Sequence, residues 1–217
     1  MDSLTALEQL RAGNLLRRVP QLLIGLFLFG WSLAMMVEAD LGLAPWDVFH
    51  QGLSHYFPLS FGTIVILVGA VVLTLWIPLR QWPGLGTVLN VIICGLAADL
   101  GLAVIGEYEA ILPRIGLLVG GVVLNGLATA MYVGTHLGPG PRDGLSVGLV
   151  HATGRSLRLV RTGVEAVVLV VGWTLGGTIG VGTVLYALGI GPLWQLFRPW
   201  TEVRLETGDE ADGPLAA

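Results

Sequence analysis

The chain has 217 residues, of which 54% are hydrophobic and only 12% are charged, and its mean hydropathy is +0.79. A soluble domain carries about a quarter charged residues, so this composition excludes an ordinary soluble protein and indicates a polytopic membrane protein. The net charge of −4 comes largely from the acidic C-terminal tail. The sequence has no basic or aromatic-interleaved patch, so nucleic acid is not an expected partner.

The N-terminal segment carries acidic and polar residues before its first Arg, which is not the pattern of a cleavable signal peptide. We expect residues 1–19 to lie in the cytoplasm, with Asp2–Arg18 forming a short amphipathic helix on the membrane surface. The acidic segment at 200–217 is expected to be a disordered cytoplasmic tail.

Hydropathy predicts six membrane-spanning helices between these ends, at about residues 20–38, 62–79, 86–105, 113–134, 157–175 and 181–197. With six spans, ten of the eleven Arg fall on the side of the two termini, and Arg114 alone falls on the other side. The positive-inside rule therefore places both termini in the cytoplasm. An eight-span model is disfavoured because its two additional segments are only about a dozen residues long, too short to cross as helices.

The chain repeats itself with an offset of 96 residues. Residues 22–100 match residues 118–196 without a gap, with 28 identities in 79 positions. The informative identities are polar or conformationally special residues: Pro45/Pro141, Asp47/Asp143, His55/His151, Gly84/Gly180 and Gly95/Gly191. The first repeat (20–112) and the second (113–199) each contain three predicted spans. Because three is odd, we expect the second repeat to be inverted in the membrane, as in many secondary transporters.

Each repeat contains a Leu-Gly phrase followed by Pro, Asp and Gly-Leu at fixed offsets. The two phrases are LGLAPWDVFHQGL at 41–53 and LGPGPRDGLSVGL at 137–149. Pro suits the first position of a helix, and an Asp two residues later can meet the free N–H groups there. We expect short re-entrant or interfacial helices at 45–57 and 141–153, while a plain helix start explains the phrase as well. Between Pro and Asp, Trp46 is expected as an interfacial anchor outside and Arg142 as a cytoplasmic-side charge.

Polar groups inside membrane spans are functional candidates by default. Arg161 and Glu165 are four residues apart and can form an intramembrane charge pair, although a snorkelling Arg beside Glu explains them equally well. The substrate or gate candidates are Pro45, Trp46, Asp47, His50, Pro141, Arg142, Asp143, Asn90 and Asn125. The two Asn more commonly join helices than bind substrate. A metal site of Asp47, His50 and His55 is disfavoured, because His55 lies about two turns beyond Asp47.

Gly-x-Gly-Thr sequences at 84–87 and 180–183 precede the last span of each repeat. Their free N–H groups are suited to an anion, and a tight helix crossing explains the glycines equally well. Asp99 is a weaker candidate because it is expected near the outer interface. The single cysteine, Cys94, is expected to be a small buried packing residue.

Three stretches resemble the YczE-like family of bacterial integral membrane proteins. They are LGxxPWDVxxxGLS at 41–54, GPGPRDGLxxGL at 138–149 and LGGxxGxGTxxxALxIGP at 175–192. The resemblance extends from about residue 20 to 198, and the YitT-type membrane proteins are more distantly similar. It implies a location in the bacterial plasma membrane and no particular substrate.

We therefore expect an all-α membrane protein that exports or exchanges an unknown small solute, with the two short helices flanking a central cavity. The alternative is a non-transporting accessory or scaffold protein that supports another membrane or biosynthetic system. No nucleophile–base constellation, Walker loop or zinc motif occurs in the sequence, so neither an enzyme nor a cofactor is expected. The lipid bilayer is the expected partner, and a homodimer stays open.

Overall fold

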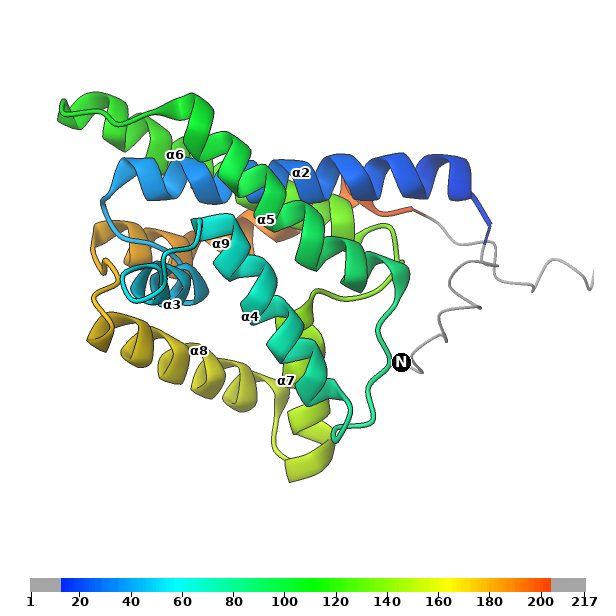
Figure 1. Ribbon diagram of the computed structural model, residues 1–217. Helices are drawn as coiled ribbons and strands as arrows, with labels where there is room; N and C mark the ends of the chain where they lie inside the picture. Colours follow the sequence, from blue (N-terminus) through cyan, green and yellow to red (C-terminus); the bar gives the residue numbers. More distant parts are fainter. Residues whose placement is uncertain (1–12, 204–217) are drawn as a thin grey trace, which may run out of the picture.

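The computed structural model describes residues 13–203, which fold into eight α-helices and no β-strand (Figure 1). In chain order the helices are α2 (Leu15–Ala39), α3 (Pro45–Ser54), α4 (Phe61–Trp76), α5 (Leu85–Ile105), α6 (Ile111–Val133), α7 (Pro141–Thr153), α8 (Leu157–Thr174) and α9 (Val181–Thr201). Of these, α2, α5 and α6 are long and apolar enough to cross a membrane, and α4 is a shorter apolar helix. Large apolar side chains such as Leu67, Leu100 and Leu188 lie exposed on the outer surface, as expected of helices that face lipid.

Each predicted span and each predicted short helix coincides with a helix, although some boundaries differ. α2 begins at Leu15, so residues 15–18 continue into the first span and are not part of a separate surface helix. Helix α2 does not extend to Gly13 and Asn14, because these residues have the positive φ values of 76° and 54° that are typical of left-handed backbone. The rest of the predicted surface helix and the tail beyond residue 203 lie outside the described residues.

The internal duplication is present in the helix boundaries. The four helices α2–α5 recur as α6–α9, and corresponding helices begin 96 residues apart, at Leu15/Ile111, Pro45/Pro141, Phe61/Leu157 and Leu85/Val181. The match therefore extends towards the N-terminus beyond residue 22, where it includes the identities Leu16/Leu112 and Arg18/Arg114. We call α2–α5 the first repeat and α6–α9 the second.

The first helices of the two repeats, α2 and α6, pack against each other along their length. Arg18, near the start of α2, donates from Nε to the carbonyl of Thr135 just beyond α6 (2.7 Å). Arg114, near the start of α6, donates from Nε to the carbonyl of Ala39 at the end of α2 (2.8 Å). The two Arg occupy corresponding positions, and so do the two carbonyls. The helices are therefore antiparallel, and each repeat satisfies the free carbonyls at the end of the other.

The helices form two bundles, and each repeat contributes two helices to each bundle. The scaffold bundle contains α2, α5, α6 and α9, and the hairpin bundle contains α3, α4, α7 and α8, where α3 packs on α8 and α4 on α7. In Figure 1, α2 and α6 run along one side of the molecule, while α7 and α8 lie on the other. The bundles meet where α4 packs on α5, whereas the corresponding helices α8 and α9 barely touch. The molecule is therefore symmetric in its connections and asymmetric in how its two bundles close.

The Leu-Gly phrase of each repeat docks on the Gly-x-Gly-Thr turn of the other. Gly86 donates from its backbone N–H to the carbonyl of Leu137 (2.7 Å), and Gly182 donates to the carbonyl of Leu41 (2.8 Å). At Gly42, whose φ is +107°, a Cβ would lie 2.5 Å from a backbone nitrogen of the opposite turn. The glycines of both motifs therefore allow two backbones to pass in close contact, and this close packing is the structural role of the Gly-x-Gly-Thr glycines.

We expect the substitution Gly144→Ala to destabilise the protein, because its Cβ would overlap the indole ring of Trp76 where α7 packs on α4. Overpacking of this kind costs about 1–3 kcal/mol. Gly163→Ala is the matched control, because a Cβ at Gly163 in α8 meets nothing within 4 Å. Thermal unfolding of both variants in the same detergent would measure the difference, and equal unfolding temperatures would contradict the described α4–α7 contact.

Candidate functional site

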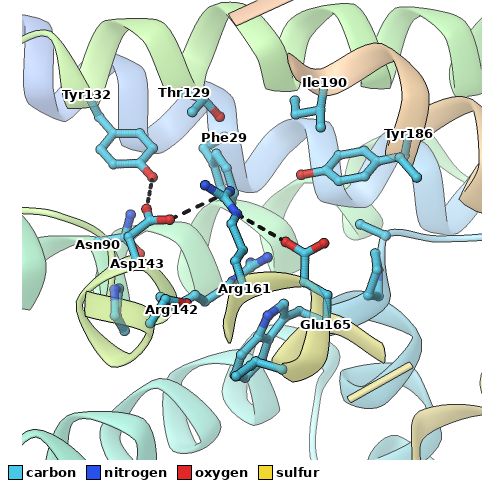
Figure 2. A pocket seen from close by; sticks show the side chains of 18 residues that line it. Phe29, Asn90, Thr129, Tyr132, Arg142, Asp143, Arg161, Glu165, Tyr186 and Ile190 are labelled. Carbon is cyan, nitrogen blue, oxygen red and sulfur yellow. Dashed lines mark hydrogen bonds and ion pairs between the residues drawn. The ribbon is translucent and has the colours of Figure 1, made fainter. Parts of the chain in front are cut away.

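The two Pro-x-Asp phrases meet at a cavity between the bundles. α3 begins at Pro45 and α7 at Pro141, both at the first helical position, where the absent N–H of Pro leaves no intrahelical bond unmade. Both Pro line a cavity of about 130 Å³, together with residues of α2, α5, α6, α8 and α9 (Figure 2). A cavity of similar volume can hold a ligand the size of benzene, so the space suits a small solute.

Trp46 and Arg142 face each other in the centre of the molecule. The guanidinium carbon of Arg142 lies 5.6 Å from the ring centroid of Trp46 and 5.7 Å from that of Phe29, within cation–π distance of both. Trp46 is only 7% exposed. The prediction of Trp46 as an outer interfacial anchor was therefore wrong, because its ring packs inside the protein, while the cytoplasmic side of Arg142 stays a prediction. These corresponding residues come together because the first turns of α3 and α7 meet where the two repeats are joined.

The nearest carboxylate to Arg142 is that of Asp47, at 4.0 Å between Nη2 and Oδ1. Asp47 is 1% exposed, and its Oδ1 lies 3.3 Å from Nδ1 of His50. Within residues 13–203, the other oxygen of Asp47 has no hydrogen-bond partner, and no side-chain hydrogen bond of Arg142 is present. The guanidinium is thus held by charge and aromatic faces, and its N–H donors are available to a group in the cavity.

A second charged cluster forms the α8 wall of the cavity. Arg161 donates from Nε to Oε1 of Glu165 (3.3 Å), and its Nη2 lies 3.7 Å from Oδ1 of Asp143. Tyr132 donates its hydroxyl to the other oxygen of Asp143 (3.5 Å). Figure 2 shows the Arg161 guanidinium between the two carboxylates. The predicted Arg161–Glu165 pair is present, and Asp143 joins it from the neighbouring helix.

The two Asn candidates have different surroundings. Asn90 lines the cavity. Asn125 does not, because it is fully buried between helices, where it donates to Ser32 Oγ (2.8 Å) and accepts from the Tyr186 hydroxyl (3.2 Å). Asn125 therefore joins α2, α6 and α9, in keeping with the interhelical alternative.

Sequence reasoning missed several cavity residues, namely Phe29, Thr129, Tyr132 and Tyr186. Two of them had a usable signal, because Tyr186 stands 96 residues after Asn90 and Phe29 stands 96 residues before Asn125. Thr129 and Tyr132 carry no local motif. Among the described residues, no three His, Cys, Asp or Glu side chains lie close enough together to hold a metal ion.

We expect Arg142→Gln to destabilise the protein by about 3 kcal/mol, because it leaves the buried carboxylate of Asp47 without its countercharge. The double variant Asp47→Asn/Arg142→Gln should recover most of this loss, since it removes both charges together. Arg155→Gln, in the exposed turn after α7, is the control. Denaturant unfolding in detergent measures all four proteins. A double variant no more stable than Arg142→Gln would show that the two groups are not coupled.

Comparison with known proteins gives a family and no activity. Residues 16–199 match the model of a family of unknown function, DUF6198. The chain is 36% identical over 176 residues to an uncharacterized protein of Haemophilus influenzae, covering 81% of each chain. It is 33% identical over 184 residues to the uncharacterized membrane protein YczE of Bacillus subtilis, covering 81% of this chain and 82% of that one. YyaS of the same organism is 30% identical over 183 residues, covering 82% and 91%. No solved structure matches.

Proposed function

Because the chain belongs to the DUF6198 family of YczE-like membrane proteins, we propose that it is a small-solute secondary transporter of the bacterial plasma membrane. The observation that carries the proposal is the charged cavity, which lies where the two repeats meet and is lined by the first turns of both short helices. In secondary transporters, substrate sites lie at the interface of repeats and are built partly from the ends of interrupted or short helices.

In the proposed topology α2, α4, α5, α6, α8 and α9 span the membrane, and both termini are cytoplasmic. The distribution of Arg supports this orientation. The single outer Arg is accounted for by its contacts, because Arg114 pairs with Asp40 (3.1 Å) and also binds the carbonyls at the end of α2. Because Arg114 caps a helix and is paired with a carboxylate, its positive charge is largely balanced and does not argue against the proposed orientation.

The second repeat is proposed to be inverted relative to the first. This is supported by α2 and α6, which occupy corresponding places in the two repeats and run antiparallel through their reciprocal Arg caps. The turn at 55–60 then lies outside and the turn at 154–156 lies inside. α3 and α7 enter from opposite faces, with their first residues meeting in the middle.

The cavity chemistry favours a small solute that carries charge. Arg142 and Arg161 provide guanidinium groups, Asp143 and Glu165 provide carboxylates, and Asn90 and the tyrosines provide neutral hydrogen-bonding groups. An apolar solute would displace water from these charged groups without replacing its hydrogen bonds, which is costly, so a solute with complementary charges is better suited to this lining.

The topology predicts that cysteines introduced at Phe57 and at Gly154, in a Cys94→Ala background, react from opposite faces of the membrane. Residue 57 should react with an impermeant maleimide added to intact cells, because its turn lies outside. Residue 154 should react only in inverted vesicles. Labelling of both positions from the same side would contradict the inverted arrangement.

Transport is tested by counterflow in proteoliposomes with a panel of radiolabelled amino acids and small carboxylates. We expect at least one solute to exchange faster than in protein-free vesicles, and Glu165→Gln and Asp143→Asn to slow this exchange about tenfold, the effect of about 1.4 kcal/mol of lost interaction. Arg155→Gln should leave the rate unchanged. Unchanged exchange in both carboxylate variants would remove these residues from the mechanism. No exchange of any solute in the panel would count against transport and favour an accessory protein.

A further inference from the structure

A second, smaller cavity lies on the other side of Arg142. It has a volume of about 30 Å³ and lies between α4, α5 and the starts of α3 and α7. Ten of its twelve lining residues have their 96-residue counterparts in the lining of the larger cavity. Arg142 and Trp46, which correspond to each other, line both. The two cavities are therefore the same feature of the two repeats, with the Arg142–Trp46 pair between them. The smaller has buried lining residues such as Cys94 and Val65, and the larger has exposed ones such as Arg161.

The α4–α5 contact, which we call the first seam, closes the smaller cavity. A Cβ at Gly95 in α5 would overlap the backbone carbonyl of Gly62 in α4, so the two helices touch through their backbones. Asp99 strengthens this contact by accepting hydrogen bonds from the N–H of Gly62 (2.7 Å) and the hydroxyl of Ser60 (2.5 Å). A carboxylate at a helix N-terminus is a favourable partner for these donors.

The corresponding contact between α8 and α9, the second seam, is open. Gly191 is the counterpart of Gly95, and a Cβ there would meet nothing within 4 Å. Ser156, the counterpart of Ser60, caps its own helix as Ser60 does, by accepting from the N–H of Leu159 (3.4 Å). In the described residues its hydroxyl makes no hydrogen bond to α9 like the one from Ser60 to Asp99. Gln195 stands at the position of Asp99, and no side-chain hydrogen bond joins it to α8 in the described structure. The glycine of the last helix is thus used in one seam and unused in the other, and the second seam has Arg158 where the first has Gly62.

We propose that the first seam is a second entrance to the solute site, which opens when the hairpin bundle rocks and the second seam closes. This inference rests on the proposed transport function and goes beyond it by assigning the two gates. In the proposed topology, the residues of the first seam lie in the outer half of the membrane and those of the second in the inner half. The described state is then open to the inside, and Arg142 is the group that a solute reaches from either entrance.

Unused space at the second seam supports the proposed motion, in which the second seam closes while the first opens. Gly191 has room around it, so α9 can be approached by α8 without overlap at this position, where the flexible side chain of Arg158 stands in place of Gly62. Interfaces between packed bundles shift between discrete arrangements, since close-packed surfaces do not deform continuously. When the first repeat adopts the arrangement of the second, and the second adopts that of the first, the same kind of packing gives two states of the whole molecule.

Cys94 provides a native reporter, because it is the only cysteine and lines the closed cavity, where it is 2% exposed. Its counterpart Ile190 lines the open cavity. In proteoliposomes of the full chain, an impermeant maleimide should leave wild-type Cys94 unmodified. It should modify Ile190→Cys in a Cys94→Ala background from the inner face.

Two substitutions should open the first seam, namely Gly62→Ala, whose Cβ would overlap the Gly95 carbonyl, and Asp99→Ala, which removes both hydrogen bonds across the seam. We expect each to raise the rate of Cys94 modification from the outer face about tenfold and to lower the rate at Ile190→Cys, since the two seams exchange. Gly191→Ala is the matched control and should leave Cys94 protected.

This reciprocal change, a higher rate at Cys94 together with a lower rate at Ile190→Cys, distinguishes gating from unfolding, because unfolding would expose both positions. An increase at both positions, or unchanged protection of Cys94 in both variants, would overturn the second entrance. Measured beside solute exchange, the result distinguishes the two proposals. Exchange without a reciprocal change leaves transport standing and rejects the assigned gates. A reciprocal change without exchange supports the seams and counts against transport.

Discussion

The antiparallel pairing of α2 with α6 is the interaction on which the rest of the structure depends. The last turn of a helix leaves carbonyls without an intrahelical partner, and inside the hydrocarbon of a membrane no water is present to bind them. Here each repeat supplies the missing donor to the other, from Arg18 to the end of α6 and from Arg114 to the end of α2. Neither repeat is complete by itself, because its first helix is capped by the other. The reciprocal caps therefore stabilise the two repeats together and fix the relative direction of the two halves.

Once these helices pair antiparallel, the remaining contacts follow in reciprocal pairs. Each Leu-Gly phrase reaches the turn before the last helix of the opposite repeat, and each short helix packs on the third helix of the opposite repeat. The starts of the two short helices must then meet near the local axis. Two identical subunits would place the same residue there twice, giving two Trp or two opposed Arg. A fused duplication can diverge at this point, and Trp46 opposite Arg142 forms a cation–π contact that no symmetric pair could make.

Much of the fold was predictable because its signals are local or periodic. Apolar run length gave the helices, Pro at the first position gave the starts of α3 and α7, and a fixed offset gave the repeat. A spacing of four placed Arg161 beside Glu165. The error at Trp46 arose because composition rules assign an aromatic residue to the interface, while depth in the molecule depends on how the repeats cross. The capping roles of Arg18, Arg114 and Asp99 join residues 37 or more positions apart, and no local pattern reports such contacts.

The 96-residue offset in the sequence also could not show that the α4–α5 contact is made in the first repeat while the equivalent α8–α9 contact is not made in the second. A sequence match treats the two seams as equal, but a single arrangement of two rigid bundles closes one and leaves the other open. The substitutions between the repeats follow this difference, because Val65 and Gly69 at the first cavity correspond to Arg161 and Glu165 at the second. Apolar walls close without stranding a charge, whereas charged walls must keep water or a partner when they approach. Closing the second seam therefore requires Arg161, Glu165 and Asp143 to remain paired with one another, and their existing contacts already provide that pairing.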